Sequence, residues 1–470
     1  MIGSNSGGTR RQVRFLRRRF LQEGELPFTD LLSRGLLMQA LADAEVVWND
    51  RIYTPLTTLW VFLSQVLSAE HSCRGAVARL IAHRLSQRQP ACSSKTGAYC
   101  QARKRLPEAF IATIARTIGR RLEKQAEAGW LWKGHHVYMF DGTTTLMPDT
   151  AENRAAYPLT FNQNEGLPLA RVAAVFSLSC GVVLDLATAR YAGKGQGEVT
   201  LFRQLSGLFS RGDVVLADCL LCNWRNFFEL NERGVHFVTR INKALRRADF
   251  RKGVSLGRDD HIVRWPKPHI RGVGRAAQRA MPRHVTVREV RVSIKTPGFR
   301  TKEIIVVTNL LDPAEYTKED LADLYRQRWN NELDLRTIKS EMGMECLRCK
   351  TPELVRKEIW VHVLAYNLIR TIMAQAATTS GFLPRTISFK GTLQTLVAFQ
   401  PIISAVADHG ASARMRLYRQ LLQAIVLHRV ADRPNRFEPR RIKRRHKHYV
   451  PLAVPRCEAK RQILKGLTKN

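Results

Sequence analysis

The sequence predicts an α/β fold that follows an all-helical N-terminal region, and three patterns support this prediction. Short apolar runs at 135–140 and 213–217 have the composition of buried strands. Residues 171–189 alternate between the two faces of a strand around the turn at 179–181, which predicts a β-hairpin. Helical spacing of apolar residues appears between and after these segments. Strands that alternate with helices are typical of α/β domains.

The chain from 26 to about 130 is predicted to be helical. Thr54-Pro55 supplies an N-cap followed by proline at the first helical position, and further helices fit 74–84 and 95–105. Three helices that end in a basic one resemble a helix-turn-helix module, which would face a DNA major groove. The candidate DNA-binding side chains are Lys95, Gln101, Arg103 and Lys104. A plain helical bundle with a basic face is the alternative.

The elements after the hairpin are predicted in the following order: a helix at 198–209, the strand at 213–217, a helix at 224–232, strands at 235–240 and 303–309, and a long apolar helix at 354–377. Residues 241–300 interrupt this series with many Arg, Lys, Gly and Pro and with short strands such as 285–292. They are predicted to form a β-rich insertion.

Four side chains with functional chemistry share one face of the basic helix that follows the strand at 303–309. At about 100° per residue, Tyr325, Arg328, Glu332 and Lys339 lie within roughly 60° of one another. A carboxylate can hold a hard divalent cation, Arg and Lys can bind phosphate oxygens, and Tyr can stack or donate a hydrogen bond beside them. This face predicts a phosphate-handling site, with a solvated amphipathic helix as the alternative.

Two aspartates upstream strengthen that prediction. Asp141 follows the apolar run at 135–140, and Asp218 follows the run at 213–217. Each is predicted to lie at the end of a buried strand, where sites in such sheets gather, although Asp is also common in turns. Two such aspartates and a glutamate on a basic helix supply the three carboxylates that two-metal phosphoryl transfer needs.

The motif Tyr-x2-Arg-x3-Glu-x6-Lys resembles the signature of the insertion-sequence-4 family of bacterial DDE transposases. Tyr325, Arg328, Glu332 and Lys339 match it without a gap. The Asp-Gly-Thr that follows the first apolar run, and the aspartate after the second, resemble that family's first and second catalytic aspartates. The resemblance covers roughly residues 130–380.

The resemblance implies a ribonuclease H-like catalytic core in which Asp141, Asp218 and Glu332 bind two Mg²⁺ or Mn²⁺ ions. The residues implied to hold the DNA strand near the cut are Tyr325, Arg328 and Lys339. The implied function is cut-and-paste transposition of an insertion sequence by a homodimer on double-stranded DNA, in a bacterial cytoplasm at the nucleoid. A structure-specific nuclease of the same fold and a non-catalytic, transposase-derived DNA-binding protein are the alternatives.

Trp265 is a further candidate DNA-binding residue in the predicted insertion. Some relatives pass through a DNA hairpin, for which a base must leave the stack and lie against an aromatic ring. Trp265 is flanked by Arg264 and Lys267 and has suitable chemistry. The alternative is that its ring packs inside the insertion.

Composition independently indicates a polyanionic partner. The chain has 76 Lys and Arg against 40 Asp and Glu, a formal net charge of +36 and a pI near 10.6. Such a surface binds nucleic acid largely through counterion release. With 470 residues and 44% hydrophobic content the chain can bury a large core, which distinguishes it from a basic tail. No apolar run approaches the roughly 20 residues of a membrane helix.

The cysteines are predicted to be reduced thiols. Nine are scattered along the chain, and two pairs, Cys219/Cys222 and Cys346/Cys349, have Cys-x2-Cys spacing. The two pairs are too far apart in sequence for a zinc ribbon, so small buried side chains are the preferred interpretation.

Both ends of the chain are basic. The N-terminal arm carries Arg10, Arg11, Arg14, Arg17, Arg18 and Arg19. Beyond about 428, basic residues are interrupted by prolines with few acids, and the candidate DNA-binding residues are Arg440, Arg441, Arg444 and Arg445. This segment is predicted to be a flexible arm that tracks phosphates, with a solubilising tail as the alternative.

The predicted division of the chain is as follows: a helical DNA-binding domain at 1–130, the core at 131–240 and 301–400, the insertion at 241–300, and a helical region with a basic tail at 401–470.

Overall fold

The computed structural model describes residues 31–49, 51–158, 166–270, 272–293, 303–406, 410–431 and 454–465. In these residues the strands form one mixed nine-stranded sheet with the order β3-β2-β1-β4-β5-β9-β8-β7-β6. The strands are β1 (Val137–Leu146), β2 (Leu169–Ser177), β3 (Val183–Arg190), β4 (Val214–Leu216), β5 (His236–Arg240), β6 (Val254–Gly257), β7 (Asp260–Pro266), β8 (His284–Ser293) and β9 (Glu303–Thr308). The prediction of an α/β fold is confirmed.

The first three strands pair antiparallel, whereas β4 runs parallel to β1 and β5 runs parallel to β4. The hairpin predicted at 171–189 is β2 and β3. One boundary was wrong, because β1 does not end at residue 140. It pairs with β2 as far as Leu146, opposite Leu169, so Asp141 lies inside the strand. The parallel ladder with β4 does stop just before it, at Met139.

The strands of the predicted insertion extend the same sheet. β9 pairs antiparallel with both β5 and β8, and β7 and β6 follow outward from β8. Residues 241–293 are therefore tied to the central strands by continuous backbone hydrogen bonding, rather than by a linker alone.

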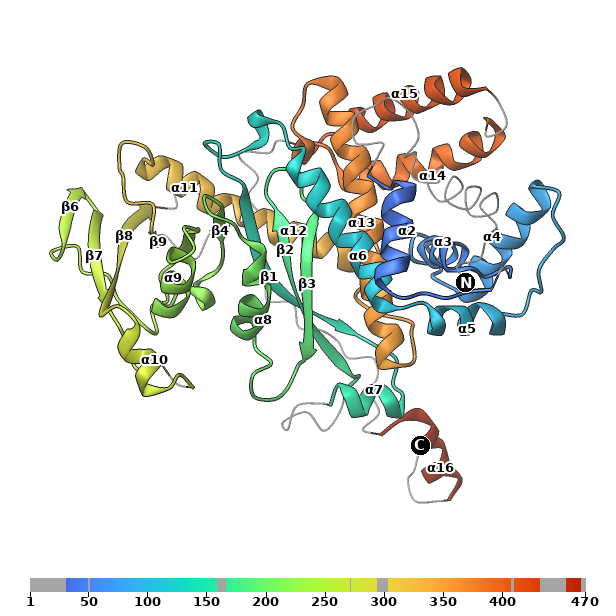
Figure 1. The fold of residues 1–470 in the computed structure, drawn as a ribbon, viewed down its shortest axis with the longest axis horizontal. Coiled ribbons are helices and arrows are strands. Elements are labelled where there is room, and N and C mark those ends of the chain that lie inside the picture. The colour runs from blue at the N-terminus through green and yellow to red at the C-terminus, as the bar shows by residue number, and fades with distance from the viewer. Residues whose placement is uncertain are drawn as a thin grey trace.

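Helices cover the sheet and fill one end of the molecule (Figure 1). They are α2 (Arg34–Asp43), α3 (Pro55–Val66), α4 (Cys73–Ser86), α5 (Gly97–Arg105), α6 (Glu108–Lys124), α7 (Ala151–Ala156), α8 (Glu198–Leu205), α9 (Trp224–Asn231), α10 (Arg275–Ala280), α11 (Lys318–Gln327), α12 (Trp329–Arg336), α13 (Pro352–Ser380), α14 (Phe389–Val406), α15 (Ala411–Leu427) and α16 (Arg456–Leu464). Among the described helices, none is both long enough and apolar enough to cross a membrane.

The N-terminal helices form as predicted and share a core with the sheet. Thr54 accepts a hydrogen bond from the Thr57 amide and Pro55 opens α3, which is the predicted cap. Apolar side chains of α2 to α6 belong to one continuous cluster with α13 and with β1 and β2. In Figure 1, α2 to α5 lie toward one end and β6 to β9 toward the other, with β1 to β3 between them.

The long helix predicted at 354–377 is α13, and it is the central support of the helical part. Thr351 caps its first turn, and Gly381, with φ +68°, ends it in the left-handed conformation that glycine adopts without steric cost. Nearly every side chain from Leu354 to Ala377 is buried, against α6, α3, α14, α15 and β3. A helix that is buried on all sides acts as a rigid scaffold for the elements around it.

Candidate functional site

The register between β1 and β4 brings Asp141 and Asp218 side by side. Met139 is opposite Leu216 in this parallel ladder, and two further residues along each chain lead to the two aspartates. Neighbouring strands are about 4.8 Å apart, so the two carboxyl groups emerge next to each other. Asp218 is also fixed locally, because its Oδ1 accepts a hydrogen bond from the Leu220 amide at 2.8 Å.

The predicted signature helix consists of three consecutive pieces rather than one regular helix. α11 ends and α12 begins at Arg328, which keeps helical angles (φ −51°, ψ −31°), and a π-helical turn at Thr337–Glu341 follows. Thr317 and Asp320 form a capping box at the start of α11, which explains why the helix begins there. Irregular π-turns inside helices are common at functional sites.

Arg328 links the side chains of this segment. Its Nη2 donates to Glu332 Oε1 at 2.8 Å, and its guanidinium lies 6.0 Å from the centre of the Tyr325 ring. α12 packs against β1, and the charge of Arg328 acts on Asp141. The structure therefore brings Asp141, Asp218, Tyr325, Arg328 and Glu332 into one neighbourhood.

Lys339 lies further along, in the π-helical turn, and its side chain is partly exposed. No hydrogen bond or ion pair of the described residues joins its amine to the carboxylates.

A buried ion-pair cluster holds α12 in place. Asp334, two residues after Glu332, accepts from Arg370 of α13 and lies 2.9 Å from Arg385 Nη2. Asp334 is 2% exposed, so removing either cation would leave a buried charge without full compensation. The position of Glu332 therefore depends on α13 and on the segment that follows it.

Burial and nearby negative charges favour the protonated form of the Asp141 carboxyl group. Its pKa is raised to about 6, chiefly by desolvation and to a smaller extent by the Asp218 and Glu198 carboxylates, while the hydrogen bond from the Gly142 amide and the charge of Arg328 lower it. Burial likewise raises the pKa of Tyr325 to about 12, so its phenol stays protonated at neutral pH. A cation placed beside Asp141 would relieve the repulsion.

The raised pKa of Asp141 predicts that the stability of the fold depends on pH. A carboxyl whose pKa rises from 3.8 to about 6 on folding binds protons more tightly in the folded state, so the protein loses stability as pH rises between these values. We expect Asp141→Asn to raise the free energy of unfolding by about 2–3 kcal/mol above pH ~6.5 without metal, and to change it little near pH ~4. Urea unfolding in EDTA at both pH values tests this. An equal difference at the two pH values would contradict it.

Two residues of this neighbourhood were not predicted. Arg240 ends β5, donates to Cys219 Sγ at 3.4 Å and acts electrostatically on Tyr325 and Arg328. The rule that places sites at strand ends could have identified it. Glu198 opens α8 and its carboxyl group lies where a Cβ on Gly142 would point, and nothing in the sequence distinguishes it from other helix-opening glutamates.

The chemistry of these carboxylates fits a hard divalent cation, since all are oxygen donors beside a partly buried strand. Among the described residues, however, no three His, Cys, Asp or Glu side chains are gathered closely enough to hold a metal ion. Glu332 is instead paired with Arg328.

Of the four candidate DNA-binding residues near the N-terminus, three are exposed and one is buried. Lys95, Gln101 and Lys104 are exposed on and before α5. Arg103 is 6% exposed, stacks 4.7 Å from the Tyr99 ring and donates to Cys73 Sγ at 3.3 Å, so its charge does not reach the surface.

Trp265 is packed inside the outer part of the sheet. It is 3% exposed, its Nε1 donates to Glu289 at 2.7 Å, and the Arg246 guanidinium lies 4.7 Å from its ring. In this conformation it offers no free face to a base. Arg440, Arg441, Arg444 and Arg445 lie outside the described residues, as does the N-terminal arginine cluster.

The cysteines follow the prediction in part. Cys222 and Cys349 are buried, as expected, but Cys346 is exposed, because it lies in the loop between the π-helical turn and α13.

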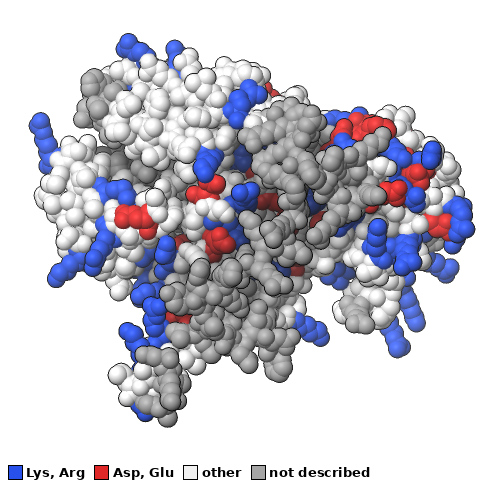
Figure 2. All heavy atoms as spheres, turned by 180° about the vertical axis from the view of Figure 1, so that it is seen from behind, with Lys and Arg blue, Asp and Glu red and all other residues white. Residues whose placement is uncertain are grey.

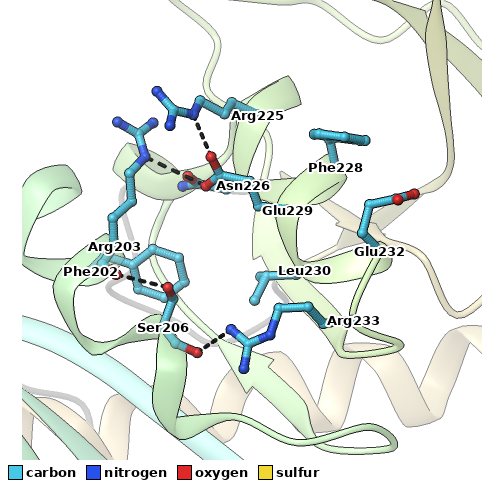
Figure 3. Close-up of a pocket in the computed structure, with 10 residues that line it drawn as sticks. All are labelled: Phe202, Arg203, Ser206, Arg225, Asn226, Phe228, Glu229, Leu230, Glu232 and Arg233. Atoms are coloured by element: carbon cyan, nitrogen blue, oxygen red, sulfur yellow. Dashed lines mark hydrogen bonds and ion pairs between the residues drawn. The ribbon is translucent and has the colours of Figure 1, made fainter. Parts of the chain in front are cut away.

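A separate hollow of about 430 Å³ lies between α8 and α9. Figure 3 shows Arg203 and Arg225 approaching Glu229, while Arg233 points toward Ser206. Its arginines are therefore engaged with partners inside the protein.

The chain is similar in sequence to known transposases. A family model described as "Transposase DDE domain" matches residues 132–368. Transposase InsG for insertion sequence element IS4 of Escherichia coli (strain K12) is 27% identical over 376 residues, which cover 77% of this chain and 79% of that protein. The transposase for insertion sequence element IS421 of Escherichia coli is 39% identical over 70 residues, or 15% and 19% of the two chains.

A solved structure, the piggyBac transposase synaptic complex with hairpin DNA, is similar at a TM-score of 0.41 with 9% identity, covering 88% of this chain and 85% of that one. This score is too low to bear on the fold. The family match is sufficient, and the chain belongs to the DDE transposases. It is a DNA transposase of the insertion-sequence-4 type, in an enzyme family whose DNA cleavage and strand transfer depend on divalent metal ions.

Proposed function

We propose that the chain catalyses cut-and-paste transposition, with Asp141, Asp218 and Glu332 as its catalytic carboxylates. One observation carries this proposal: the register of β1 against β4 aligns the two aspartates, and Arg328 links Glu332 to the same neighbourhood. Two bound Mg²⁺ or Mn²⁺ ions would activate the attacking oxygen and stabilise the leaving one.

The chain's own cations complete the site. Arg328 neutralises the phosphate at the reacting strand, since its planar guanidinium already spans Glu332 and Tyr325 and can present two N–H groups to phosphate oxygens. Tyr325, protonated at neutral pH, donates a hydrogen bond to the strand end. Lys339 contributes charge from the adjacent π-helical turn.

The catalytic core is ribonuclease H-like in this proposal. The strand order β3-β2-β1-β4-β5, with three antiparallel strands followed by two parallel ones, supports it, as does the placement of Asp141 on the first strand and Asp218 after the fourth. The helices before residue 130 would form the DNA-binding region, with Lys95 and Lys104 as exposed contacts.

The charge of the surface suits DNA along its length. Lys and Arg side chains are spread over the face shown in Figure 2, with smaller groups of Asp and Glu among them. A homodimer would bring two transposon ends together, and the basic segment at 440–445 would add phosphate contacts.

Strand joining separates this function from that of a nuclease. Incubated with pre-cleaved transposon ends, a target plasmid and Mg²⁺, the protein is expected to yield ends covalently joined to the plasmid. Asp141→Asn should yield none. Nicking of the DNA without joined product would instead identify a structure-specific nuclease, and neither product would indicate a DNA-binding protein without catalysis.

A further inference from the structure

The segment 261–288, which contains β7, α10 and the start of β8, is strongly basic. Its 28 residues include seven Lys and Arg and no Asp or Glu. Two of these cations have partners inside the protein. Arg288 is buried and paired with Asp260, and Lys267 Nζ donates to two backbone carbonyl oxygens at the C-terminal end of α10. These two charges therefore stabilise the outer part of the sheet.

The helix α10 carries two further arginines on a fully accessible surface. None of its six residues is buried, so the hydrophobic effect contributes little to holding it in place. Polar contacts hold it instead, because Gln278 Nε2 donates to two carbonyl oxygens of the preceding loop, at 2.9 Å and 2.8 Å. Together with Lys267, Gln278 fixes the helix and leaves Arg275 and Arg279 exposed.

The exposed arginines of this segment lack a counter-charge. Arg275 and Arg279 are four residues apart on α10, so they lie on one side of the helix, where like charges are unfavourable. Arg283, just before β8, is also exposed. Within the part of the chain that the structure describes, none of these three side chains forms an ion pair or a hydrogen bond. A polyanion would supply the charge that the protein does not.

The surroundings of these arginines favour contacts with phosphates rather than with bases. Stacking on a base needs an exposed aromatic ring, but Trp265 is 3% exposed and its Nε1 donates to Glu289. Reading a base edge needs a side chain held in a fixed orientation, and no described residue holds the three arginines in this way. Contacts with phosphates carry no sequence information. The expected ligand is therefore a duplex of any sequence.

We propose that Arg275, Arg279 and Arg283 form a phosphate-contacting surface, the α10 surface, which binds target DNA independently of its sequence. The proposal rests on the proposed function in one respect, since it takes the polyanion to be the DNA into which a transposon end is joined. In Figure 1, α10 lies toward the end of the molecule opposite α2 to α5, the helices proposed to bind DNA. The α10 surface is thus separate from that region.

The first measurement is the salt dependence of binding of the full chain to a random-sequence duplex, by fluorescence anisotropy in EDTA. Each phosphate contact contributes about 0.9 to the slope of log affinity against log salt concentration. We expect Arg275→Gln/Arg279→Gln to lower the slope by about 1.8, and Arg283→Gln to lower it by about 0.9 more. Glutamine and arginine have similar helix propensities, and thermal unfolding confirms that the variants fold. An unchanged slope would refute the α10 surface.

The matched control is Arg251→Gln/Arg326→Gln. These side chains are 90% and 62% exposed, and their replacement lowers the net charge by the same amount, but each is already paired with an aspartate. The control should therefore change the slope little. Equal effects of the two double variants would mean that net charge, and not the α10 surface, determines the affinity.

A joining assay separates target DNA from the transposon end. With Mg²⁺ and subsaturating target plasmid, Arg275→Gln/Arg279→Gln is expected to join pre-cleaved ends about tenfold less, while it cleaves a transposon end at the wild-type rate. Equal losses of cleavage and joining would assign the surface to the transposon end and overturn the proposal. If the wild-type chain itself gave no joined product, the proposed function would fail, whereas a smaller salt slope of the variant would still support a DNA contact at α10.

Discussion

Asp141→Asn, Asp218→Asn and Glu332→Gln are each expected to lower DNA cleavage in Mg²⁺ by at least about a hundredfold, since loss of even an outer partner of a metal site costs 10- to 100-fold. Each substitution removes one hard oxygen ligand and leaves every cation of the surface in place. Binding to the transposon end should therefore stay nearly unchanged. Cleavage of a labelled transposon end and a gel-shift titration with the same DNA measure the two properties separately.

Asp323→Asn is the matched control for these variants. Asp323 lies on α11, close in sequence to Glu332, but its side chain is 67% exposed and paired with Arg326. It should keep wild-type cleavage. Full cleavage by any one of the three catalytic variants would refute the assignment of that carboxylate, and a parallel loss of DNA binding would indicate misfolding.

The second large expected effect is a loss of DNA cleavage or joining when Arg328 is replaced. Arg328→Lys keeps the positive charge but loses the planar group that contacts Glu332 and lies near the Tyr325 ring, so we expect cleavage or joining to fall by about tenfold or more. The reason is geometric, because an ammonium group cannot make the same two-point contact with a phosphate. Single-turnover cleavage rates are the measurement, since they separate the chemical step from product release.

Arg326→Lys supplies the comparison. Arg326 is two residues away, 62% exposed and paired with Asp323, on the side of the helix that turns away from Glu332. Charge, helix propensity and local sequence are nearly the same in both variants. Equal cleavage rates would mean that Arg328 acts as general surface charge and not as part of the site.

The sequence predicted well those elements whose patterns are local. The period-two alternation at 171–189 became β2 and β3, and the apolar stretch at 354–377 became α13. The strand at 135–140 was cut short because Asp141-Gly142-Thr143 has the polarity of a turn. Pairing with β2 nevertheless carries it on to Leu146, since a partner strand satisfies the backbone groups that a turn would leave open.

The sequence predicted the residues of the motif but not the residues from other segments that surround them. Spacing alone suggested that Tyr325, Arg328, Glu332 and Lys339 share a face. The structure links the first three, whereas Lys339 lies further along, in the π-helical turn. Glu198 and Arg240 come from distant segments, so their approach depends on the tertiary fold. Burial is equally non-local: periodicity could not distinguish Lys104, which faces solvent, from its neighbour Arg103, which stacks on Tyr99 in the core.

The buried ion pairs of Asp334 can form only late in the synthesis of the chain. The chain emerges from the ribosome N-terminus first, so Asp141 and Asp218 are made long before Arg370 and Arg385, the two cations that fix the helix carrying Glu332. A polypeptide that ends before Arg385 would lack one of the two cations that compensate the buried Asp334 carboxylate. The helix that carries Glu332 therefore gains its full support only after translation has passed the end of α13.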